Sequence, residues 1–350
     1  MHVNDCIIPS ILCNLPFLRK EYDSVASLTI RNLDDTLINA LKRKAGASAR
    51  SVEAELRIAL KAWADQPAMM QIEAVSQRLQ QAIALAENGR VSDFSTRPPY
   101  SAARLADAIG EDQVTLVAQW IEGIAEPSLS QLKAIANYCS VSPDWLVYGE
   151  GTPYLCEYDR IPENAGQGAL WLLDADPTTL KTHLQGLRFI RCAGERGGLL
   201  LVKQWADKDL VIRTPYVVSD DTGGGGRSSL RNLTQVWHLL YRIYGECNLA
   251  PDIVITSHIV SERTYRQLQD GWHNPSALIH GLPSQPWWED IWDSNEFARS
   301  NYWPGWNKLC AGLYEEVSDS NREANIRELI ESGEHPLLKE IENAALLAGC

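Results

Sequence analysis

The chain has 350 residues, of which 45% are hydrophobic and 22% charged, and its formal net charge is −13. This length suits two or three globular domains, and no apolar run reaches the roughly 18–20 residues that a membrane span requires. The negative net charge excludes a protein that coats nucleic acid through charge alone. The eight cysteines form no C-x-x-C pair, which argues against a zinc ribbon or a redox motif. Single cysteines spread along the chain favour a reducing cytoplasm.

Residues 1–24 are predicted to be an N-terminal tail without fixed structure. They contain an apolar stretch, residues 6–18, that is broken by Pro9 and Pro16. No basic region precedes this stretch and no clear small-residue cleavage site follows it, so we do not expect a signal peptide. The alternative is a translation start further along the chain, because the next pattern begins at Val25.

Residues 25–66 are predicted to form one strand and two helices. Polar and apolar residues alternate over Ser27–Arg31, as they do in a half-buried strand. The first helix is expected to bury one stripe, which consists of Leu37, Ile38, Leu41 and Ala45. Ser51 is a predicted N-cap of the second helix. The apolar face of that helix consists of Val52, Leu56, Ala59, Leu60 and Trp63.

The charge of this module differs from that of the whole chain. Residues 24–63 contain seven Lys and Arg against four Asp and Glu, a balance of +3. About 40 residues are too few to bury a core alone, and a single strand leaves its backbone groups unpaired. Two copies that pair their strands would form a two-stranded ribbon, which fits the major groove of DNA. Ser27, Thr29 and Arg31 would then face the bases, and the helix start at Ser51 would face a phosphate.

The segment ASLTIRNLDDTLINALKRKAGASARSVEAELRIALKAW resembles the ribbon-helix-helix repressors of the Arc/MetJ type, and among them the Fit-type antitoxins. This resemblance implies that Arg31 reads bases and that the fold is an obligate dimer. In those antitoxins a short tail after the second helix blocks a partner toxin nuclease, whereas a long chain follows here. The alternative is an element that only dimerises through its helices and leaves the strand in solvent.

Residues 67–153 are predicted to form an all-α helix-turn-helix domain. Its helices are expected over residues 69–87, 100–110, 111–123 and 127–141. The order LADAIG…VAQWIEGIAEPSLSQLKAIANYCSVSPDWLVYGEG resembles the lambda-repressor-like, or Cro/cI-type, family. This resemblance implies that the helix after the turn at Gly110 lies in the major groove. It assigns Gln113, Thr115 and Gln119 as readers and places Trp120 in the core.

Two features depart from that family's pattern. The interval from Gly110 to Trp120 is one residue longer, which leaves the register of the readers open. The helix also opens with Glu111 and Asp112, and residues 105–132 contain no Lys or Arg, although DNA affinity relies mainly on phosphate neutralisation. The alternative is a helix-turn-helix fold that serves packing or dimerisation.

Residues 154–350 carry no family resemblance and are predicted to form an α+β domain. Strands are expected in LRFIRCAGERGGLLLVKQW, which contains two, and in DLVIRTPYVV and DIVITSHIV. Helices are expected after Ser228 or Ser229, after Ser261, and over residues 321–349 with an interruption near Pro336. The run SDDTGGGGRSS is predicted to be a flexible connection, because it lacks the G-x-x-x-x-G-K-[ST] spacing of a phosphate loop.

This last region shows no familiar catalytic or metal-binding pattern. His258, His273 and His280 do not share a helical face, and neither G-x-S-x-G nor H-E-x-x-H occurs. Five tryptophans fall within 20 residues, namely Trp287, Trp288, Trp292, Trp303 and Trp306. Such a cluster most often forms a core, and the alternative is a ligand pocket or a partner surface. We therefore expect no enzymatic activity, no cofactor and no metal.

These patterns favour a multidomain transcriptional repressor that acts as a dimer, with a β-ribbon in the major groove and the helix-turn-helix as a second contact. The predicted partners are double-stranded DNA, further copies of the chain in a homodimer or higher homo-oligomer, and a toxin or small-molecule effector at residues 154–350. No membrane partner is expected. The main alternative is an antitoxin that represses its own operon and binds a toxin through residues 154–350. A third hypothesis is an enzyme that the two DNA-binding modules bring to DNA. Residues 154–350 show no nucleophile paired with a base, so this hypothesis is not favoured.

Overall fold

The computed structural model describes residues 35–88, 100–176, 179, 181–194, 196–206, 208–246 and 253–348. The chain divides into two compact units after Pro67. The predicted tail, residues 1–24, and the predicted strand, Ser27–Arg31, lie outside the described residues. Within the described ranges, no helix is both long and apolar enough to cross a membrane.

The first unit contains α1 (Asp35–Ala47) and the beginning of α2 (Val52–Asn88), so both predicted helices of this module are confirmed. The helix predicted after Ser51 and the one predicted over residues 69–87 are, however, a single helix. The connection between them is rich in helix-forming residues such as alanine and glutamine. Pro67 removes one backbone donor from this helix without ending it.

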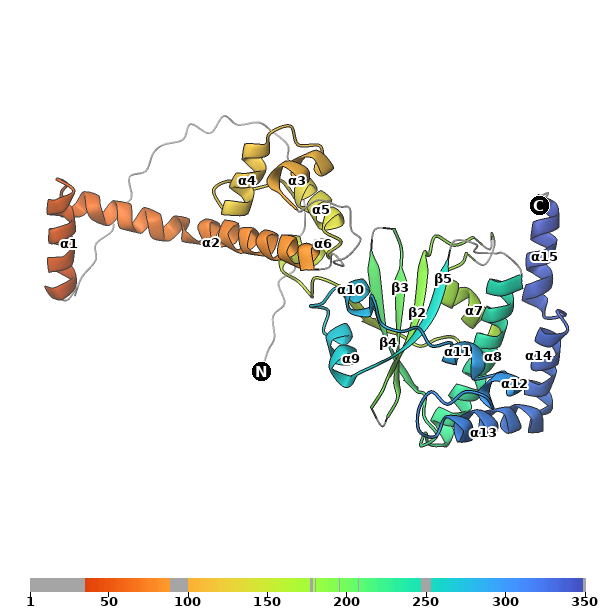
Figure 1. The fold of residues 1–350 in the computed structure, drawn as a ribbon. Coiled ribbons are helices and arrows are strands. Elements are labelled where there is room, and N and C mark those ends of the chain that lie inside the picture. The colour runs from red at the N-terminus through yellow and green to blue at the C-terminus, as the bar shows by residue number, and fades with distance from the viewer. Residues whose placement is uncertain are drawn as a thin grey trace, which may run out of the picture. The chain divides into compact units, whose positions relative to one another are not determined.

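The helix-turn-helix module consists of the C-terminal half of α2 and four short helices (Figure 1). These are α3 (Ala102–Ile109), α4 (Val114–Glu122), α5 (Leu129–Tyr138) and α6 (Pro143–Tyr148). Their ends follow local signals. Gly110 and Gly123 each close a helix at φ 72°, a conformation that suits glycine, and Ser128 and Gln131 form a capping box at the start of α5. The helices predicted over residues 100–141 are therefore confirmed.

The core of this module lies between α2 and the four short helices. Leu79, Val117 and Ile135 are fully buried there, and Trp120 is 2% exposed, as its predicted core position requires. Ser76 of α2 fastens the end of α4, because its hydroxyl donates to the backbone oxygen of Ile121 at 2.6 Å. The segment that precedes α3 in sequence therefore belongs to the same packed unit.

The C-terminal domain is built on a five-stranded mixed sheet with the order β1-β4-β3-β2-β5. Its strands are β1 (Leu155–Tyr158), β2 (Gly186–Cys192), β3 (Gly198–Gln204), β4 (Asp209–Val217) and β5 (Val254–Val260). The strands β2, β3 and β4 form an antiparallel meander, while β5 pairs in parallel with β2 and β1 in parallel with β4. Four of these strands confirm the prediction, and β1 was not predicted.

Nine helices of the described chain complete this domain. They are α7 (Ala165–Leu173), α8 (Gly224–Glu246), α9 (Glu262–Gln269), α10 (Pro275–Ile279), α11 (Trp287–Asp290), α12 (Ser294–Phe297), α13 (Trp306–Asp319), α14 (Asn321–Glu331) and α15 (Pro336–Ala348). The start of α9 after Ser261 and the break before Pro336 were predicted correctly. The helices α7 and α10 to α13 were not predicted.

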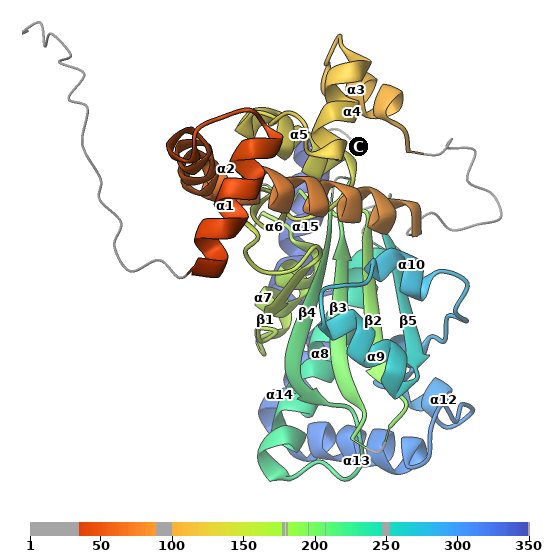
Figure 2. The same ribbon diagram turned by 90° about the vertical axis from the view of Figure 1, so that its left-hand side faces the viewer.

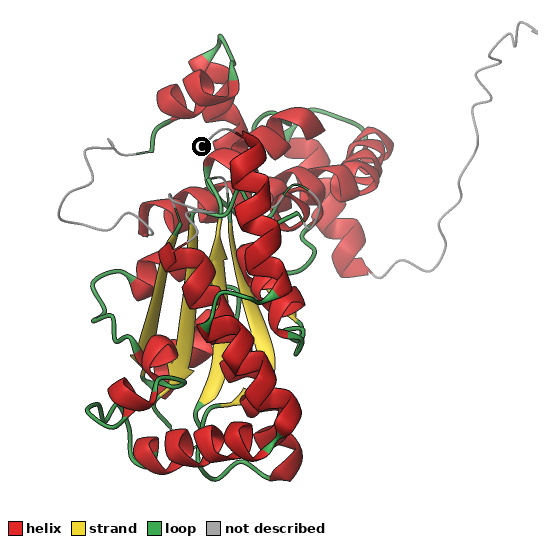
Figure 3. Cartoon of the chain, turned by 90° about the vertical axis from the view of Figure 1, so that its right-hand side faces the viewer, coloured by secondary structure: helices red, strands yellow, loops and turns green. Residues whose placement is uncertain are grey.

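Helices cover both faces of the sheet, which Figure 1 shows between two helical layers. The helices α9 and α10 lie on one face (Figure 2), and α8 and the C-terminal helices lie on the other (Figure 3). Successive residues of β2 separate accordingly, since Phe189 belongs to the larger core beneath α8 and Ile190 to a smaller core beneath α9. The same two-sided burial explains the unbroken apolar run Leu199–Val202 in β3, where every side chain is fully buried.

The prediction for the Gly-rich run is wrong for residues 224–229, which are helical, whereas residues 219–223 form a connection before the helix. The helix α8 begins at Gly224, and neither Ser228 nor Ser229 is its N-cap. Of these glycines, Gly226 is the crowded one. A Cβ atom on Gly226 would lie 2.3 Å from Cγ2 of Thr222, so a larger residue there would require Thr222 to shift.

The helices α7 and α8 approach closely because Gly168 has no side chain. A Cβ atom there would lie 2.4 Å from the backbone oxygen of Pro162 and 2.7 Å from Cγ2 of Val236. We expect Gly168→Ala to lower the free energy of unfolding by about 1–3 kcal/mol, the usual scale for overpacking, in urea titrations. Gly166→Ala is the matched control, because a Cβ there meets nothing closer than 3.5 Å and should stabilise α7 by about 0.5–1 kcal/mol. Equal effects of the two substitutions would contradict the close packing.

Candidate nucleic-acid interface

The predicted readers of the ribbon, Ser27, Thr29 and Arg31, lie outside the described residues. The helix that follows them is described, and its C-terminal half exposes the three consecutive cations Lys42–Lys44. Exposed cations beside a reading element favour contact with a phosphate backbone. The roles of the three readers remain a prediction.

Three apolar side chains of this module are exposed in the single chain. Leu37 on α1 is 46% exposed, and Ile58 and Leu60 on α2 are 45% and 38% exposed. Burial of such a side chain stabilises a complex by about 1.5–3 kcal/mol. These residues are therefore candidates for an interface between two copies, which itself stays a prediction.

Ser51 stands at the start of α2, as predicted. Its hydroxyl accepts a hydrogen bond at 3.1 Å from the backbone N–H three residues later. The other first N–H groups of a helix lack an intrahelical acceptor and suit an anion. Two acids lie in this first turn, and both are paired, Glu53 with Arg57 at 2.5 Å and Glu55 with Arg50 at 3.6 Å. This pairing reduces the repulsion that a phosphate at Ser51 would meet, and the contact stays a prediction.

The three predicted readers of the helix-turn-helix lie on or next to α4. Gln113 is exposed at the N-cap position and makes no capping bond with its side chain. Thr115 is exposed and Gln119 is half-buried, and their spacing of four residues places them on one helical face. Val114, 45% exposed, stands between Gln113 and Thr115. The structure thus brings Thr115 and Gln119 together, and their contact with DNA stays a prediction.

The surroundings of α4 are acidic. Residues 105–132 contain five Asp and Glu and no Lys or Arg. The carboxylate of Glu111 is fixed at the start of this helix, because it accepts from Nε2 of Gln131 at 2.9 Å and from the backbone N–H of Gln113 at 3.2 Å. The guanidinium of Arg78 points inward and donates at 2.9 and 3.0 Å to two backbone oxygens at the end of α6, where burial lowers its pKa. Residues 105–132 therefore offer no cation to a phosphate backbone, and the nearest cations along the chain are the exposed Arg104 and Lys133.

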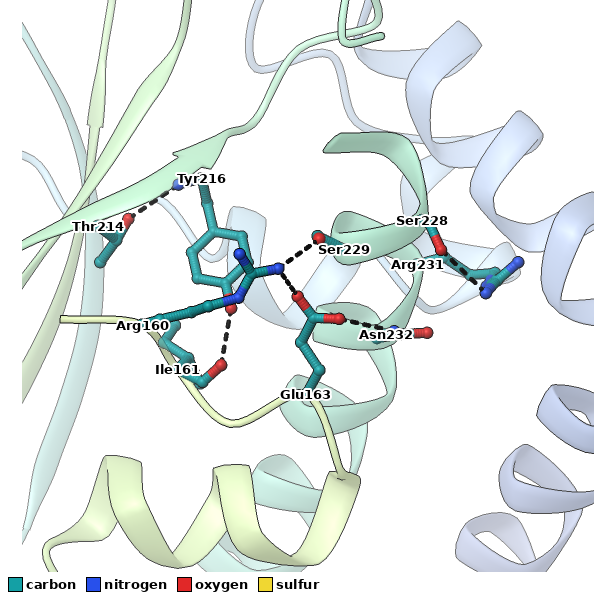
Figure 4. A network of polar contacts seen from close by, with 9 residues as sticks. All are labelled: Arg160, Ile161, Glu163, Thr214, Tyr216, Ser228, Ser229, Arg231 and Asn232. Atoms are coloured by element: carbon teal, nitrogen blue, oxygen red, sulfur yellow. Dashed lines mark hydrogen bonds and ion pairs between the residues drawn. The ribbon is translucent and has the colours of Figure 1, made fainter. Parts of the chain in front are cut away.

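A second polar site surrounds the start of α8 in the C-terminal domain (Figure 4). Arg160 pairs with Glu163 and donates to the hydroxyl of Ser229 at 2.9 Å, and Nδ2 of Asn232 donates to the other oxygen of Glu163 at 2.9 Å. Burial opposes ionisation of Glu163, but these hydrogen bonds outweigh it and lower the pKa of the carboxyl. The network borders a cavity of about 350 Å³ beside the Gly-rich turn. Its cation is already neutralised, so the site lacks the free lysine of a phosphate loop.

Two of the three histidines weighed as metal ligands are hydrogen-bonded to protein groups. The ring of His258 contacts the backbone oxygen of Pro283 at 3.0 Å and the hydroxyl of Thr256 at 3.1 Å. The ring of His273 lies 3.1 Å from the carboxylate of Asp270. In the part of the chain that is described, no three His, Cys, Asp or Glu side chains are grouped to hold a metal ion.

A half-buried chain of polar side chains that the sequence analysis missed joins α10 to the sheet. Arg188 donates to Oε1 of Gln204 at 2.9 Å, and Nε2 of Gln204 lies 3.3 Å from the hydroxyl of Ser276. That hydroxyl donates to Asp209 at 2.6 Å. Burial lowers the pKa of Arg188 and raises that of Asp209. Because each group has a protein partner, this chain of bonds accounts for the position of α10.

Comparison with known proteins yields two matches, each limited to one module. Residues 26–64 match the family described as antitoxin FitA-like, ribbon-helix-helix. Residues 100–146 match a helix-turn-helix family. A search of curated proteins and a search of solved structures found no match. The predicted order of the two modules is confirmed, and both families point to a DNA-binding transcription regulator or an antitoxin-like protein with DNA as a partner.

Proposed function

We propose that this chain is a sequence-specific transcriptional repressor that binds its operator as a dimer through a β-ribbon in the major groove. The match of residues 26–64 to a ribbon-helix-helix family carries the proposal. The balance of +3 over residues 24–63, in a chain with a net charge of −13, supports this module as the main DNA contact. A ribbon requires two strands, and the exposed Leu37, Ile58 and Leu60 support pairing of two copies.

The helix-turn-helix has a lesser part in this proposal. A second contact on the same dimer gains from effective concentration, so it can add affinity even when it binds weakly alone. The acidic residues 105–132 oppose a strong contact. Base reading is therefore assigned to Ser27, Thr29 and Arg31, and no catalytic role is proposed for residues 154–350.

Replacement of Arg31 tests the proposal. A bidentate contact from arginine to guanine contributes about 1–3 kcal/mol of discrimination, so Arg31→Ala should weaken specific binding by about 5- to 150-fold per contact. The measurement is enrichment of genomic fragments by the intact protein, followed by titration of the enriched site at two salt concentrations. Unchanged affinity of Arg31→Ala for that site would refute the ribbon as the reader.

Arg43→Ala is the matched control for a phosphate contact, because Arg43 is an exposed arginine on α1. It should weaken binding to all sequences alike and reduce the slope of log affinity against log salt by about 1. Arg31→Ala should instead reduce the difference between the enriched site and random DNA. The two variants thereby distinguish base reading by Arg31 from phosphate contact by Arg43.

An antitoxin that represses its own operon is the second candidate, and the FitA-like description of the matched family favours it. In that case residues 154–350 would hold a toxin. Co-expression with the adjacent gene tests this candidate. Purification of an equimolar complex with a small nuclease, whose activity returns when the complex is dissociated, would favour the antitoxin. A chain that represses a reporter without such a partner would favour the first candidate.

A further inference from the structure

The helix-turn-helix module carries an open apolar groove of about 500 Å³. Residues from α2, α4, α5 and α6 line it, among them Leu116, Trp120, Leu132 and Val147. Trp120, Leu132 and Val147 are 2%, 3% and 7% exposed, so they form a packed floor. This volume lies within the range of ligand-binding clefts.

The rim of the groove carries exposed apolar side chains and one carboxylate. Leu129, at the start of α5, lines the groove and is 59% exposed, and Ile124, on the loop that leads to it, is 67% exposed. Glu126, on the same loop, lines the groove as an exposed carboxylate. A cluster of large exposed apolar side chains next to a cleft marks an interaction surface.

Charge decides which occupant fits. Residues 105–132 contribute five acids and no Lys or Arg, so the face repels the phosphate backbone of DNA. A second copy of the same face would bring like charges together. The apolar stretch of this chain at residues 6–18 is followed by Arg19 and Lys20, but its two prolines interrupt a helical pattern, so it does not match an amphipathic helix.

We infer that this groove binds an amphipathic helix of a partner protein, with apolar side chains on the groove floor and flanking Lys or Arg against the acidic rim. Helices dock into grooves through anchors spaced i, i+3 or i+4, and i+7, which is the pattern that an apolar floor between helices accepts. Opposite charges on the rim align the helix and accelerate its association. This inference goes beyond the proposed repressor and replaces the second DNA contact of the helix-turn-helix, because it assigns the α4 face to a protein and leaves operator reading to the ribbon.

The test uses the full chain and labelled peptides of about 18 residues, long enough to be helical. The probe peptide has leucines at helical spacing flanked by lysines, a second peptide has glutamate for each lysine, and a third has the probe's composition in scrambled order. Fluorescence anisotropy should show binding of the probe, at least tenfold weaker binding of the scrambled peptide, and no binding of the acidic one. Equal binding of the probe and the scrambled peptide would overturn the inference.

Substitutions on the protein identify where the peptide binds. Leu129→Lys and Glu126→Lys change exposed rim residues and should each weaken probe binding at least tenfold. The controls are Tyr148→Lys, at a residue that is 56% exposed, and Glu150→Lys, at another exposed acid. Both control residues lie outside the groove lining, and less than a twofold change is expected. If the controls weaken binding as much as the rim variants, the peptide binds acidic surface in general and the inference fails.

A separate measurement of DNA affinity tests whether the α4 face binds DNA instead of a helix. The double variant Gln113→Ala, Gln119→Ala should change affinity for fragments enriched by the intact protein by less than twofold. A loss of tenfold or more would assign the α4 face to DNA and overturn the inference. Arg31→Ala should retain probe binding, so failure of the repressor proposal and failure of this inference give different results.

Discussion

Replacing Trp287 by alanine is expected to lower the free energy of unfolding of the C-terminal domain by about 3–5 kcal/mol. Trp287 is fully buried, and its ring centroid lies 5.7 Å from that of Trp237 and 5.9 Å from that of Trp303. Truncation leaves a cavity among these rings, which the rest of the domain fills only in part. Whole domains are stable by about 5–15 kcal/mol, so this loss is a large fraction.

Guanidinium titration of the full chain, followed by tryptophan fluorescence and circular dichroism, measures this loss. Trp272→Ala is the matched control, because Trp272 is 42% exposed and meets one aromatic ring, that of Trp145, edge-on at 6.3 Å. We expect the control to lose less than half as much stability. If Trp287→Ala proved as stable as the native chain, the tryptophan cluster would be a binding surface rather than core, which is the alternative that the sequence left open.

The sequence predicted elements whose signals are local. Gly110 and Gly123 end helices, Ser128 begins one, and the apolar run Leu199–Val202 forms a strand, because each signal lies within or beside its element. The strand β1 was missed because its four residues pair with β4, from Leu210 onward, and form no strand without that distant partner. The helix α13 was missed although its signal is local, because its buried residues, Trp306, Leu309, Cys310, Leu313 and Val317, are spaced as on one helical face.

The candidate sites follow the same division. Ser51 stands at a helix start, where local sequence placed it, whereas Gln113 is the N-cap of a helix that was predicted to begin at Glu111. The hydrogen bonds of Arg160, Glu163 and Asn232 join residues up to 69 positions apart, and the packing of the loop before α7 against α8 brings them together. The groove beside α4 is likewise assembled from four helices. Its acidic charge was visible in the sequence, and its shape was not.

Acid should destabilise the C-terminal domain through His238. Burial lowers the pKa of this histidine from 6.5 to about 4, with a further contribution from Arg242 and Arg327 and an opposing one from Asp293. The ring is 5% exposed and stacks on Trp292, with centroids 4.1 Å apart and planes at 10°. The cavity beside it, about 20 Å³, admits no more than one water molecule. A proton on His238 is therefore poorly solvated in the folded state.

The direction of the change in stability with pH follows from which state of the chain binds the proton. Between pH 6.5 and pH 4 the unfolded chain takes up a proton at this residue and the folded chain does not, so stability is complete above pH 6.5 and falls as the pH drops through this window. Moving the pKa from 6.5 to about 4 corresponds to about 3 kcal/mol, and below pH 4 the folded form also binds the proton and the loss ends. Denaturant titrations at pH 7, 5.5 and 4 measure this loss.

His238→Phe isolates this contribution, because phenylalanine keeps a ring against Trp292 and cannot take up a proton. The pKa values of His258 and His335 are also lowered by burial, so the native chain will lose stability from several histidines, and only the difference from His238→Phe belongs to His238. That difference should grow by about 3 kcal/mol between pH 7 and pH 4. A curve for His238→Phe that runs parallel to that of the native chain would mean that the folded domain binds a proton at His238 as readily as the unfolded chain does, which would contradict the burial of this ring against Trp292.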